Sequence, residues 1–550
     1  MSRATPAPSI GLYLRGVFVA VMVGGLFLGV AAQLVRLSLV TRTEMRVASA
    51  EPIGRVFSRP DILDRGGRLV ATDVAMPSLY ADPAMILDLD EVIEKLARTF
   101  PDLDATELRR SLGDRTRRFA WIKRGLAPLQ AQRAHDLGLP GLAFRQEPKR
   151  VYPAGALLGH LVGYVNVDNK GAAGIERHID DNLGIESVLG AAQSRIPPVG
   201  LSIDLGVQQA LASELKEALT RYQASGASGL VMDVTTGELV AAVSLPELDP
   251  EKPVEAQAEG RLDRLSTGVY ELGSIFKILT VAMALDEKTA TLDKVYDVRE
   301  PLKFGQHTIN DLHPLGRPLS MRDVFIHSSN VGAGMIALEA GSARQIGFLS
   351  RFGLLSGART EAGPVAAPIV PKRWGEVETV TIAYGHGLAT TPVHFSAAVA
   401  ALVNGGTRVT PTVLARRKDI AGERLVSAQT SAAMRDLLRL NVTSPQGTGR
   451  RAEVAGYRVG GKTGTAEMPG KGGYQRKAVI SSFIAAFPMD APRFLTFVSL
   501  FEPRASEETK GQITAGVNAA PLTGRLIARV APLLDVLPDR VTQESASRVN

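Results

Sequence analysis

The stretch SGLVMDVTTGELVAAVSL, from Ser228 to Leu245, consists of two apolar runs separated by a short polar segment. The polar segment contains Thr-Thr-Gly, which favours a turn between two strands. The pattern therefore predicts a β-hairpin. Two further apolar runs, at 478–487 and 494–501, predict a second pair of strands near the C-terminal end of the chain.

Helical patterns fill the chain between these strand pairs, at 274–287, 322–340 and 392–403, and another follows at 523–534. Strands at both ends of a region with helices between them predict an antiparallel sheet covered by helices. The sequence therefore favours an α+β fold for the region 196–535.

Charge and cysteine content restrict the function. The net charge is +7 over 550 residues, and residues 1–50 contribute +4 of it, because they hold five arginines and one glutamate. The other 500 residues carry only +3, which is too even for a nucleic-acid-binding surface. The absence of cysteine excludes disulfides, thiolate metal sites and a cysteine nucleophile.

A long apolar run lies near the N-terminus. Residues 16–35 contain Gln33 as their only polar side chain, and about 20 such residues span a bilayer core. The nearest Ala-x-Ala, at 48–50, lies far beyond the run, which argues against a cleaved signal peptide. We expect an uncleaved single-span anchor after a tail at 1–15, with a buried core helix as the alternative. Arginines flank both ends, so charge leaves the orientation open.

The remaining chain divides into regions that differ in composition and in strand and helix pattern. A linker is expected at 41–60, and the segment 36–195 as a whole predicts a mixed domain with short strands. This domain includes an arginine-rich helix at 107–118, whose arginines predict a solvated face or, alternatively, an interaction surface. The region 196–535 is the helix-covered sheet, and 536–550 is a polar tail.

Ser274 and Lys277 form the pattern S-x-x-K at the start of an apolar helix. Residues three apart share a helix face, so the Lys277 amine can approach the Ser274 hydroxyl and take its proton. The start of a helix also offers free N–H groups to an oxyanion. About two such strings are expected by chance in a chain of this length, so the motif needs support from other motifs.

Ser328, Ser329 and Asn330 supply a second pattern, S-x-N. The Ser328 hydroxyl could relay a proton between Lys277 and a leaving nitrogen, and the Asn330 amide could orient Lys277 and a substrate carbonyl. The alternative is an ordinary helix cap, which the same residue types favour.

Lys462, Thr463, Gly464 and Thr465 supply the third pattern, K-T-G-T. On a strand edge, the Thr465 N–H could face an oxyanion, while Lys462 and both threonine hydroxyls could face a substrate carboxylate. Gly464 would let a substrate backbone come close. The residues 456–463 also fit a nucleotide phosphate loop, which requires a strand before it and a helix from Lys462. The flanking residues are polar and glycine-rich, so we expect no nucleotide.

The order S-x-x-K, S-x-N, K-T-G resembles that of penicillin-binding proteins and serine β-lactamases. The resemblance extends to further segments typical of class B penicillin-binding proteins: 59–69, 121–124, 150–155, 160–168 and 174–176. The segment 152–176 is most similar to the division-specific, FtsI-type transpeptidases of Gram-negative bacteria. Asp263-Arg264 and Ala515-Gly516 depart from the family's usual Asn-Arg and Gly-Gly.

The resemblance implies a penicillin-binding transpeptidase domain on an elongated pedestal of the dimerisation type. It implies that Ser274 attacks the D-Ala-D-Ala bond of a peptidoglycan stem peptide, with Lys277, Ser328, Asn330 and Lys462 as catalytic partners. The backbone N–H groups of Ser274 and Thr465 would form the oxyanion hole, and Thr463, Gly464 and Thr465 would bind substrate. A stem-peptide amine would then complete a cross-link, and β-lactams would acylate Ser274.

The resemblance also implies a periplasmic catalytic domain on the inner membrane, at the division site. Its expected partners are divisome proteins, including a septal glycosyltransferase of the FtsW type. The alternatives are an elongation-type transpeptidase, an inactive scaffold or β-lactam sensor, and a serine β-lactamase. No cofactor is expected, because the histidines at 307, 313, 386 and 394 lack the spacing of a zinc site. The glycines around His386 predict a turn.

Overall fold

The computed structural model describes Leu14, the helix Val17–Leu34, and residues 59–183, 197–253, 261–305, 307–416, 422–470 and 473–539. The helix Val17–Leu34 is long and apolar enough to cross a membrane, and it lies where the anchor is predicted. Apart from Leu14 and the last linker residues, the predicted N-terminal tail and linker lie outside the described residues, as does the end of the polar tail.

A five-stranded antiparallel sheet, in the order β14-β15-β16-β6-β7, forms the centre of the region 196–535. β6 (Gly226–Asp233) and β7 (Leu239–Leu245) pair as the predicted hairpin. β15 (Gly473–Phe487) and β16 (Phe494–Phe501) are the predicted C-terminal strands, and β14 (Gly460–Gly470) forms one edge of the sheet. The predicted antiparallel sheet is confirmed.

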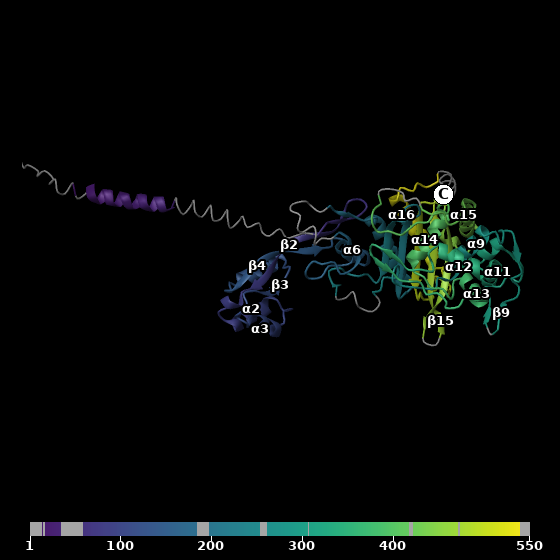
Figure 1. Ribbon diagram of the computed structural model, residues 1–550, viewed down its shortest axis with the longest axis horizontal. Helices are drawn as coiled ribbons and strands as arrows, with labels where there is room; N and C mark the ends of the chain where they lie inside the picture. Colours follow the sequence, from purple (N-terminus) through teal and green to yellow (C-terminus); the bar gives the residue numbers. More distant parts are fainter. Residues whose placement is uncertain are drawn as a thin grey trace, which may run out of the picture. The chain divides into compact units, whose positions relative to one another are not determined.

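Helices and short strands complete this region (Figure 1). Its helices are α8 (Leu205–Arg221), η4 (Gly273–Phe276), α9 (Lys277–Asp286), α10 (Met321–Ile326), α11 (Asn330–Ala340), α12 (Ser342–Arg351), α13 (Glu376–Ala383), α14 (Pro392–Val403), α15 (Ala428–Thr443), η5 (Arg450–Ala452) and α16 (Ala519–Leu533). Its short strands are β8 (Val295–Tyr296), β9 (Leu302–Phe304), β10 (His307–Ile309), β11 (Leu319–Ser320), β12 (Ala358–Thr360) and β13 (Gly363–Val365).

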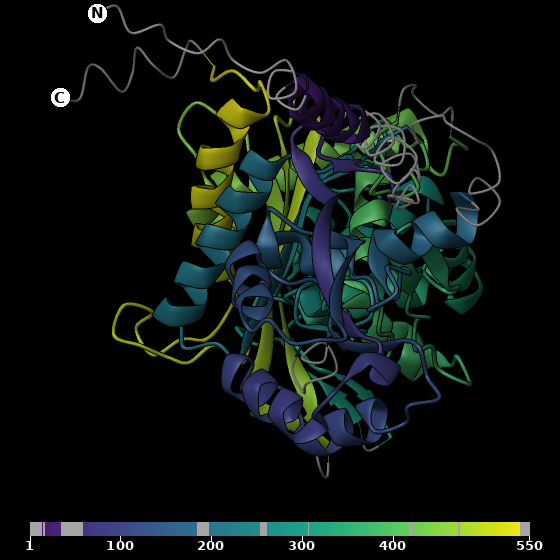
Figure 2. The ribbon, with the colours of Figure 1, turned by 90° about the vertical axis from the view of Figure 1, so that its left-hand side faces the viewer.

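Both faces of the sheet are buried. Leu495 and Phe497 of β16 belong to a core shared with α9, α14 and α15, whereas Phe494 and Val498 belong to a second core shared with α8 and α16. Figure 2 shows α8 and α16 side by side, and these two helices pack against each other. Because alternate residues of one strand enter two cores, the strands read as continuous apolar runs in the sequence.

The predicted helix at 322–340 is wrong, because the structure breaks it into α10 and α11 at the S-x-N motif. Ser328 adopts a left-handed backbone conformation, with φ of 61°, which a helix cannot continue through. Ser329 then caps α11, and its hydroxyl accepts the N–H of Gly332 at 2.9 Å. The break places the Ser328 side chain at the tip of a turn rather than on a helix face.

The residues 74–149 form a separate compact unit. β2 (Leu69–Ala81) enters this unit, and the other elements are η1 (Pro83–Met85), α2 (Leu89–Thr99), α3 (Ala105–Leu112), β3 (Ala120–Lys123), α4 (Pro128–Asp136) and β4 (Leu142–Val151). The predicted arginine-rich helix ends at Leu112 instead of Arg118, because a turn at Asp114, whose carboxylate accepts the Thr116 N–H, follows Gly113. The arginines 115, 117 and 118 therefore lie in a loop.

The larger compact unit comprises 59–73 together with the chain from Arg150 onward. Its first elements are β1 (Ile62–Leu63), η2 (Gly155–Leu158), α5 (Gly159–Val162), α6 (Gly174–Leu183) and β5 (Val199–Gly200). The buried Glu176 carboxylate binds Arg59 Nε at 2.9 Å and Arg150 Nε at 2.6 Å. Three segments that carry the family resemblance therefore meet in one buried ion-pair network.

Candidate active site

Ser274 lies in the short helix η4, immediately before α9. Gly273 precedes it with φ of 56°, and a Cβ on Gly273 would lie 2.6 Å from the Thr465 carbonyl oxygen. Its N–H donates to the Gly385 carbonyl at 3.2 Å. The glycine therefore lets the serine turn fit between the sheet edge β14 and the turn that follows α13.

Lys277 is almost fully buried, with 1% of its surface exposed, and its amine is surrounded by oxygen atoms. Lys277 Nζ lies 2.8 Å from Ser274 Oγ, 2.8 Å from the Ser328 carbonyl oxygen and 2.7 Å from Asn330 Oδ1. The carbonyl and amide oxygens can only accept hydrogen bonds. A neutral amine has two N–H groups, so these two acceptors use both and leave its lone pair for the Ser274 hydroxyl proton.

Lys462 approaches the same cluster from β14. Its Nζ lies 2.9 Å from Ser328 Oγ, and Lys277 Nζ lies 3.2 Å from the same oxygen. Lys462 has no exposed surface, and its amine lies 5.7 Å from the centre of the Phe325 ring. The Ser328 hydroxyl thus connects two buried amines, an arrangement that can pass a proton between them.

The electrostatics favour a neutral Lys277. Burial, together with the charge of Lys462, holds the pKa of Lys277 well below its usual 10.5, although the Asp311 carboxylate opposes this shift. Burial lowers the pKa of Lys462 to about 7. Within the described part of the chain, neither lysine forms an ion pair with a carboxylate. A neutral lysine beside a serine is a competent general base.

The K-T-G-T segment lies in β14 and runs beside the serine turn. A Cβ on Gly464 would lie 2.5 Å from the Leu272 carbonyl oxygen, so the glycine allows the strand to approach η4. Thr463 Oγ1 donates to Thr448 Oγ1 at 2.8 Å, and Thr465 Oγ1 accepts the N–H of Ala515 at 3.1 Å. Since strand side chains alternate, the two threonines lie on the face opposite to Lys462.

The position of Lys462 inside a strand rules out the phosphate loop that its flanking glycines resemble. A phosphate loop requires a helix that begins at this lysine, and the chain instead continues as β14 to Gly470. The glycines at 460, 461 and 464 serve close packing, because a Cβ on any of them would lie less than 3.0 Å from a neighbouring atom.

The sequence prediction missed several residues around the cluster. Asp311 binds the S-x-N segment, and no local pattern connects it with residues about 20 positions later. Glu271 accepts the N–H of Gly387 at 2.8 Å and thereby ties the serine turn to the predicted turn at 385–387, which is confirmed. His386 in that turn has its pKa lowered by burial, although the charge of Glu271 raises it. Thr448 was also missed, because it follows α15 in a polar loop.

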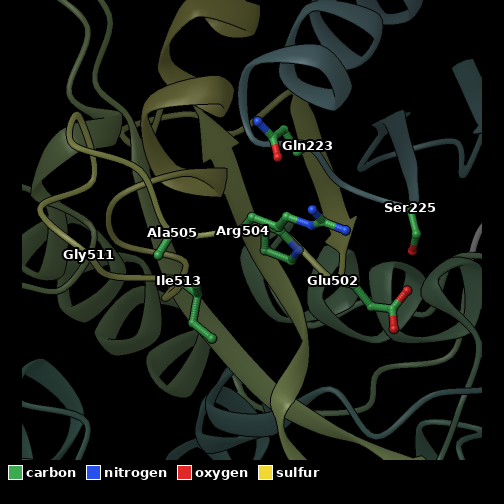
Figure 3. A pocket seen from close by; sticks show the side chains of 8 residues that line it. Gln223, Ser225, Glu502, Arg504, Ala505, Gly511 and Ile513 are labelled. Carbon is green, nitrogen blue, oxygen red and sulfur yellow. The ribbon is translucent and has the colours of Figure 1, made fainter.

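A separate pocket of about 640 Å³ lies beyond the end of β16 (Figure 3). Residues of the loop after β16 line it together with Gln223 and Ser225, and Figure 3 shows Arg504 extending across it toward Ser225 and Glu502. None of the predicted site residues lines this pocket. The same loop continues to Ala515, whose N–H donates to Thr465 Oγ1. This hydrogen bond connects the loop that lines the pocket with the K-T-G-T strand.

Comparisons with known proteins identify the family. Residues 227–520 match the model of the penicillin binding protein transpeptidase domain, and residues 56–191 match that of the penicillin-binding protein dimerisation domain. The chain belongs to the penicillin-binding proteins, and the presence of both domains makes it a class B member.

Curated relatives cover nearly the whole chain. The chain is 36% identical to the probable peptidoglycan D,D-transpeptidase FtsI of Caulobacter vibrioides, over 97% of this chain and 91% of that protein. It is 28% identical to the peptidoglycan D,D-transpeptidase FtsI of Escherichia coli K12, over 92% and 88%. The solved apo transpeptidase domain of Burkholderia pseudomallei penicillin-binding protein 3 is 30% identical and matches with a TM-score of 0.55, covering 62% of this chain and 97% of that one.

Proposed function

We propose that this chain is a membrane-anchored peptidoglycan D,D-transpeptidase that cross-links stem peptides during septal wall synthesis. The observation that carries the proposal is a chain of three side-chain contacts. Ser274 Oγ lies 2.8 Å from Lys277 Nζ, Lys277 Nζ lies 3.2 Å from Ser328 Oγ, and Ser328 Oγ lies 2.9 Å from Lys462 Nζ. These residues come from three distant segments, so the fold assembles a nucleophile, its base and a relay at one place.

In the first half-reaction, Lys277 Nζ takes the proton of Ser274 Oγ, and Oγ attacks the carbonyl carbon between the two terminal D-alanines. The backbone N–H groups of Ser274 and Thr465 hold the developing oxyanion. The proton then passes from Lys277 through Ser328 Oγ to the leaving nitrogen. The C–N bond breaks, the terminal D-alanine departs, and an ester joins the stem peptide to Ser274.

In the second half-reaction, the side-chain amine of a neighbouring stem attacks the ester carbon. Lys277 accepts the proton of this amine and returns it to Ser274 Oγ when the ester bond breaks, which leaves a 4→3 amide cross-link. A β-lactam undergoes only the first half-reaction. Its ring opens when Ser274 attacks, but the leaving nitrogen remains part of the same molecule and stays in the site. The acylated Ser274 is then blocked.

Substrate recognition is assigned to the sheet edge β14. The Thr463 and Thr465 hydroxyls lie on one face of the strand and are assigned to the C-terminal carboxylate of a stem peptide, whereas Lys462 on the opposite face contacts Ser328. Thr465 Oγ1 has a second lone pair and a proton available besides its bond from Ala515. Asn330 Oδ1 accepts from Lys277 Nζ and orients it, and the Asn330 amide is assigned to orienting a substrate carbonyl.

The apolar helix and the relatives support the proposed cellular setting. The helix Val17–Leu34 suits a single-span anchor, and we assign the catalytic domain to the periplasm, where peptidoglycan lies. The similarity to FtsI of two bacteria favours the division site over elongation. A septal glycosyltransferase of the FtsW type is the expected partner, because the chain requires newly made glycan strands as its substrate.

Product analysis tests the proposed reaction. The purified full-length chain, given a donor pentapeptide and an acceptor stem with a free side-chain amine, should release D-alanine and form a cross-linked dimer detectable by mass spectrometry. Ser274→Ala should form none. Release of D-alanine without the dimer would indicate hydrolysis and contradict the transferase. Support of septation by Ser274→Ala in cells would instead favour the scaffold alternative.

A further inference from the structure

The S-x-N turn is held from outside by Asp311, a residue in the loop between β10 and β11. The Asp311 carboxylate accepts the Ser329 hydroxyl at 2.7 Å, the Asn330 N–H at 2.5 Å and the Val331 N–H at 2.9 Å. One side chain therefore binds three consecutive residues at the N-terminus of α11. These N–H groups would otherwise lack partners, because the first turn of a helix has no intrahelical acceptors.

The same turn carries the oxygens that surround Lys277. The left-handed φ of 61° at Ser328 interrupts the helix, and the Ser328 carbonyl oxygen accepts a hydrogen bond from Lys277 Nζ at 2.8 Å. Asn330 Nδ2 donates to the Asn310 carbonyl at 3.3 Å, which turns Asn330 Oδ1 toward Lys277. Residues 310 and 311 together therefore fix both the backbone and the amide orientation of the turn.

We propose that Asp311 is a positioning residue for the proposed acylation: it holds the S-x-N turn so that Ser328 and Asn330 present two acceptor oxygens to Lys277. With both N–H groups of the neutral amine directed to these acceptors, the lone pair points at Ser274. Without Asp311, the turn loses three hydrogen bonds, and the amine can rotate its lone pair away from the serine. The inference rests on the proposed serine chemistry.

Asp311 also acts through charge. The charged groups that shift the pKa of Lys277 are Lys462 from β14 and Asp311 from the loop before α10, and the charge of Lys277 in turn lowers the pKa of His386 in the turn after α13. Of these, the Asp311 carboxylate stabilises the ammonium form and raises the pKa of Lys277. Removing this negative charge therefore lowers the pKa of Lys277 and makes the neutral base available at lower pH.

The isosteric variant Asp311→Asn separates charge from shape. The carboxamide oxygen still accepts both N–H groups, and its NH₂ can donate to the Ser329 hydroxyl. Asp311→Ala removes charge and hydrogen bonds together. Asp323→Asn on α10 is the matched control, because Asp323 pairs with Arg317 at 3.6 Å and forms no bond to the site.

The test measures the second-order rate constant for acylation of the full-length chain by a fluorescent penicillin, from pH 5 to pH 9. Rates are normalised to the amount of acylatable protein at saturation, so partial misfolding of a variant does not affect them. Asp311→Asn should move the acidic limb of the profile to lower pH by roughly half a unit to one unit. Asp311→Ala should in addition lower the plateau about tenfold or more, and Asp323→Asn should match the wild type.

Profiles of Asp311→Asn and Asp311→Ala that both coincide with the wild-type profile would overturn the inference. A uniform rate decrease without a shifted limb in Asp311→Asn would also contradict it, because a merely structural role predicts that result. Failure of the wild-type chain itself to acylate would instead refute the proposed function on which the inference rests.

Discussion

Replacing Gly464 by alanine tests the contact between the sheet edge and the serine turn. The new Cβ would lie 2.5 Å from the Leu272 carbonyl oxygen and 3.0 Å from Ile275 Cγ2. A carbon and a carbonyl oxygen normally approach to about 3.3 Å. Because the closest neighbour is a backbone atom, no side-chain rotation can relieve the clash, and β14 must move from η4 by about 0.8 Å.

This displacement acts on both stability and reactivity. Overpacking of a dense interior costs about 1–3 kcal/mol of unfolding free energy. A misplacement of about 1 Å can lower a reaction rate about 100-fold, and here it separates Lys462 and the Thr465 N–H from Ser274. We therefore expect Gly464→Ala to be acylated by fluorescent penicillin about 100-fold more slowly, and to unfold at a lower urea concentration.

Gly347→Ala is the matched control, because Gly347 lies within α12 and a Cβ there meets no atom within 4 Å. This substitution should raise the unfolding free energy by about 0.5–1 kcal/mol, since alanine is the better helix former, and it should leave acylation unchanged. If Gly464→Ala were acylated within threefold of the wild-type rate, the proposed fit between β14 and η4 would be refuted.

Three further predictions follow from buried charges. Lys277→Met should lower the acylation rate by about 10²–10⁴-fold at every pH, because it removes the proposed general base, and a rate within tenfold of wild type would contradict that role. Burial lowers the pKa of Lys462 from 10.5 to about 7, so between pH 7 and pH 10.5 the unfolded chain binds more protons than the folded chain. The free energy of unfolding should therefore rise with pH across this range, by at most about 5 kcal/mol. Urea unfolding at pH 7 and pH 10 should show a smaller rise in Lys462→Met, and an equal rise would contradict the assignment. Arg150→Met should lower the free energy of unfolding by about 3–5 kcal/mol, because it leaves the buried Glu176 carboxylate with an incomplete set of partners. Arg299→Met, at the exposed pair with Asp297, should lower it by less than about 1 kcal/mol. Equal urea denaturation midpoints for the two variants would refute the difference.

The predicted fold rested on strands whose pattern is unambiguous. The hairpin of β6 and β7 and the strands β15 and β16 are continuous apolar runs, because each is buried on both faces, and turn residues separate them. The order of these strands in the sheet depends on long-range pairing, which no local pattern encodes. The division into compact units was equally inaccessible, since it joins 59–73 with residues beyond 150.

The motifs predicted the residues of the site, but they did not predict the turn and the neighbouring side chains that hold these residues in place. The positions of Ser274, Lys277, Ser328 and Lys462 follow from short patterns with fixed chemistry, and the structure brings their polar atoms together. The helix break at Ser328 was missed, because apolar helix-forming residues stand on both sides of it and no local pattern marks the left-handed residue between them. Asp311 was missed for the same reason, since its partners lie about 20 residues away.

Mass spectrometry of the chain after incubation with benzylpenicillin tests whether Ser274 is the nucleophile of an acyl-transfer reaction. We expect a stable covalent adduct of one penicillin per chain, located by peptide mapping on Ser274 and absent from Ser274→Ala. Location of the adduct on another residue would contradict the role of Ser274, and rapid turnover of penicillin without accumulation of an adduct would contradict the transpeptidase and favour a β-lactamase.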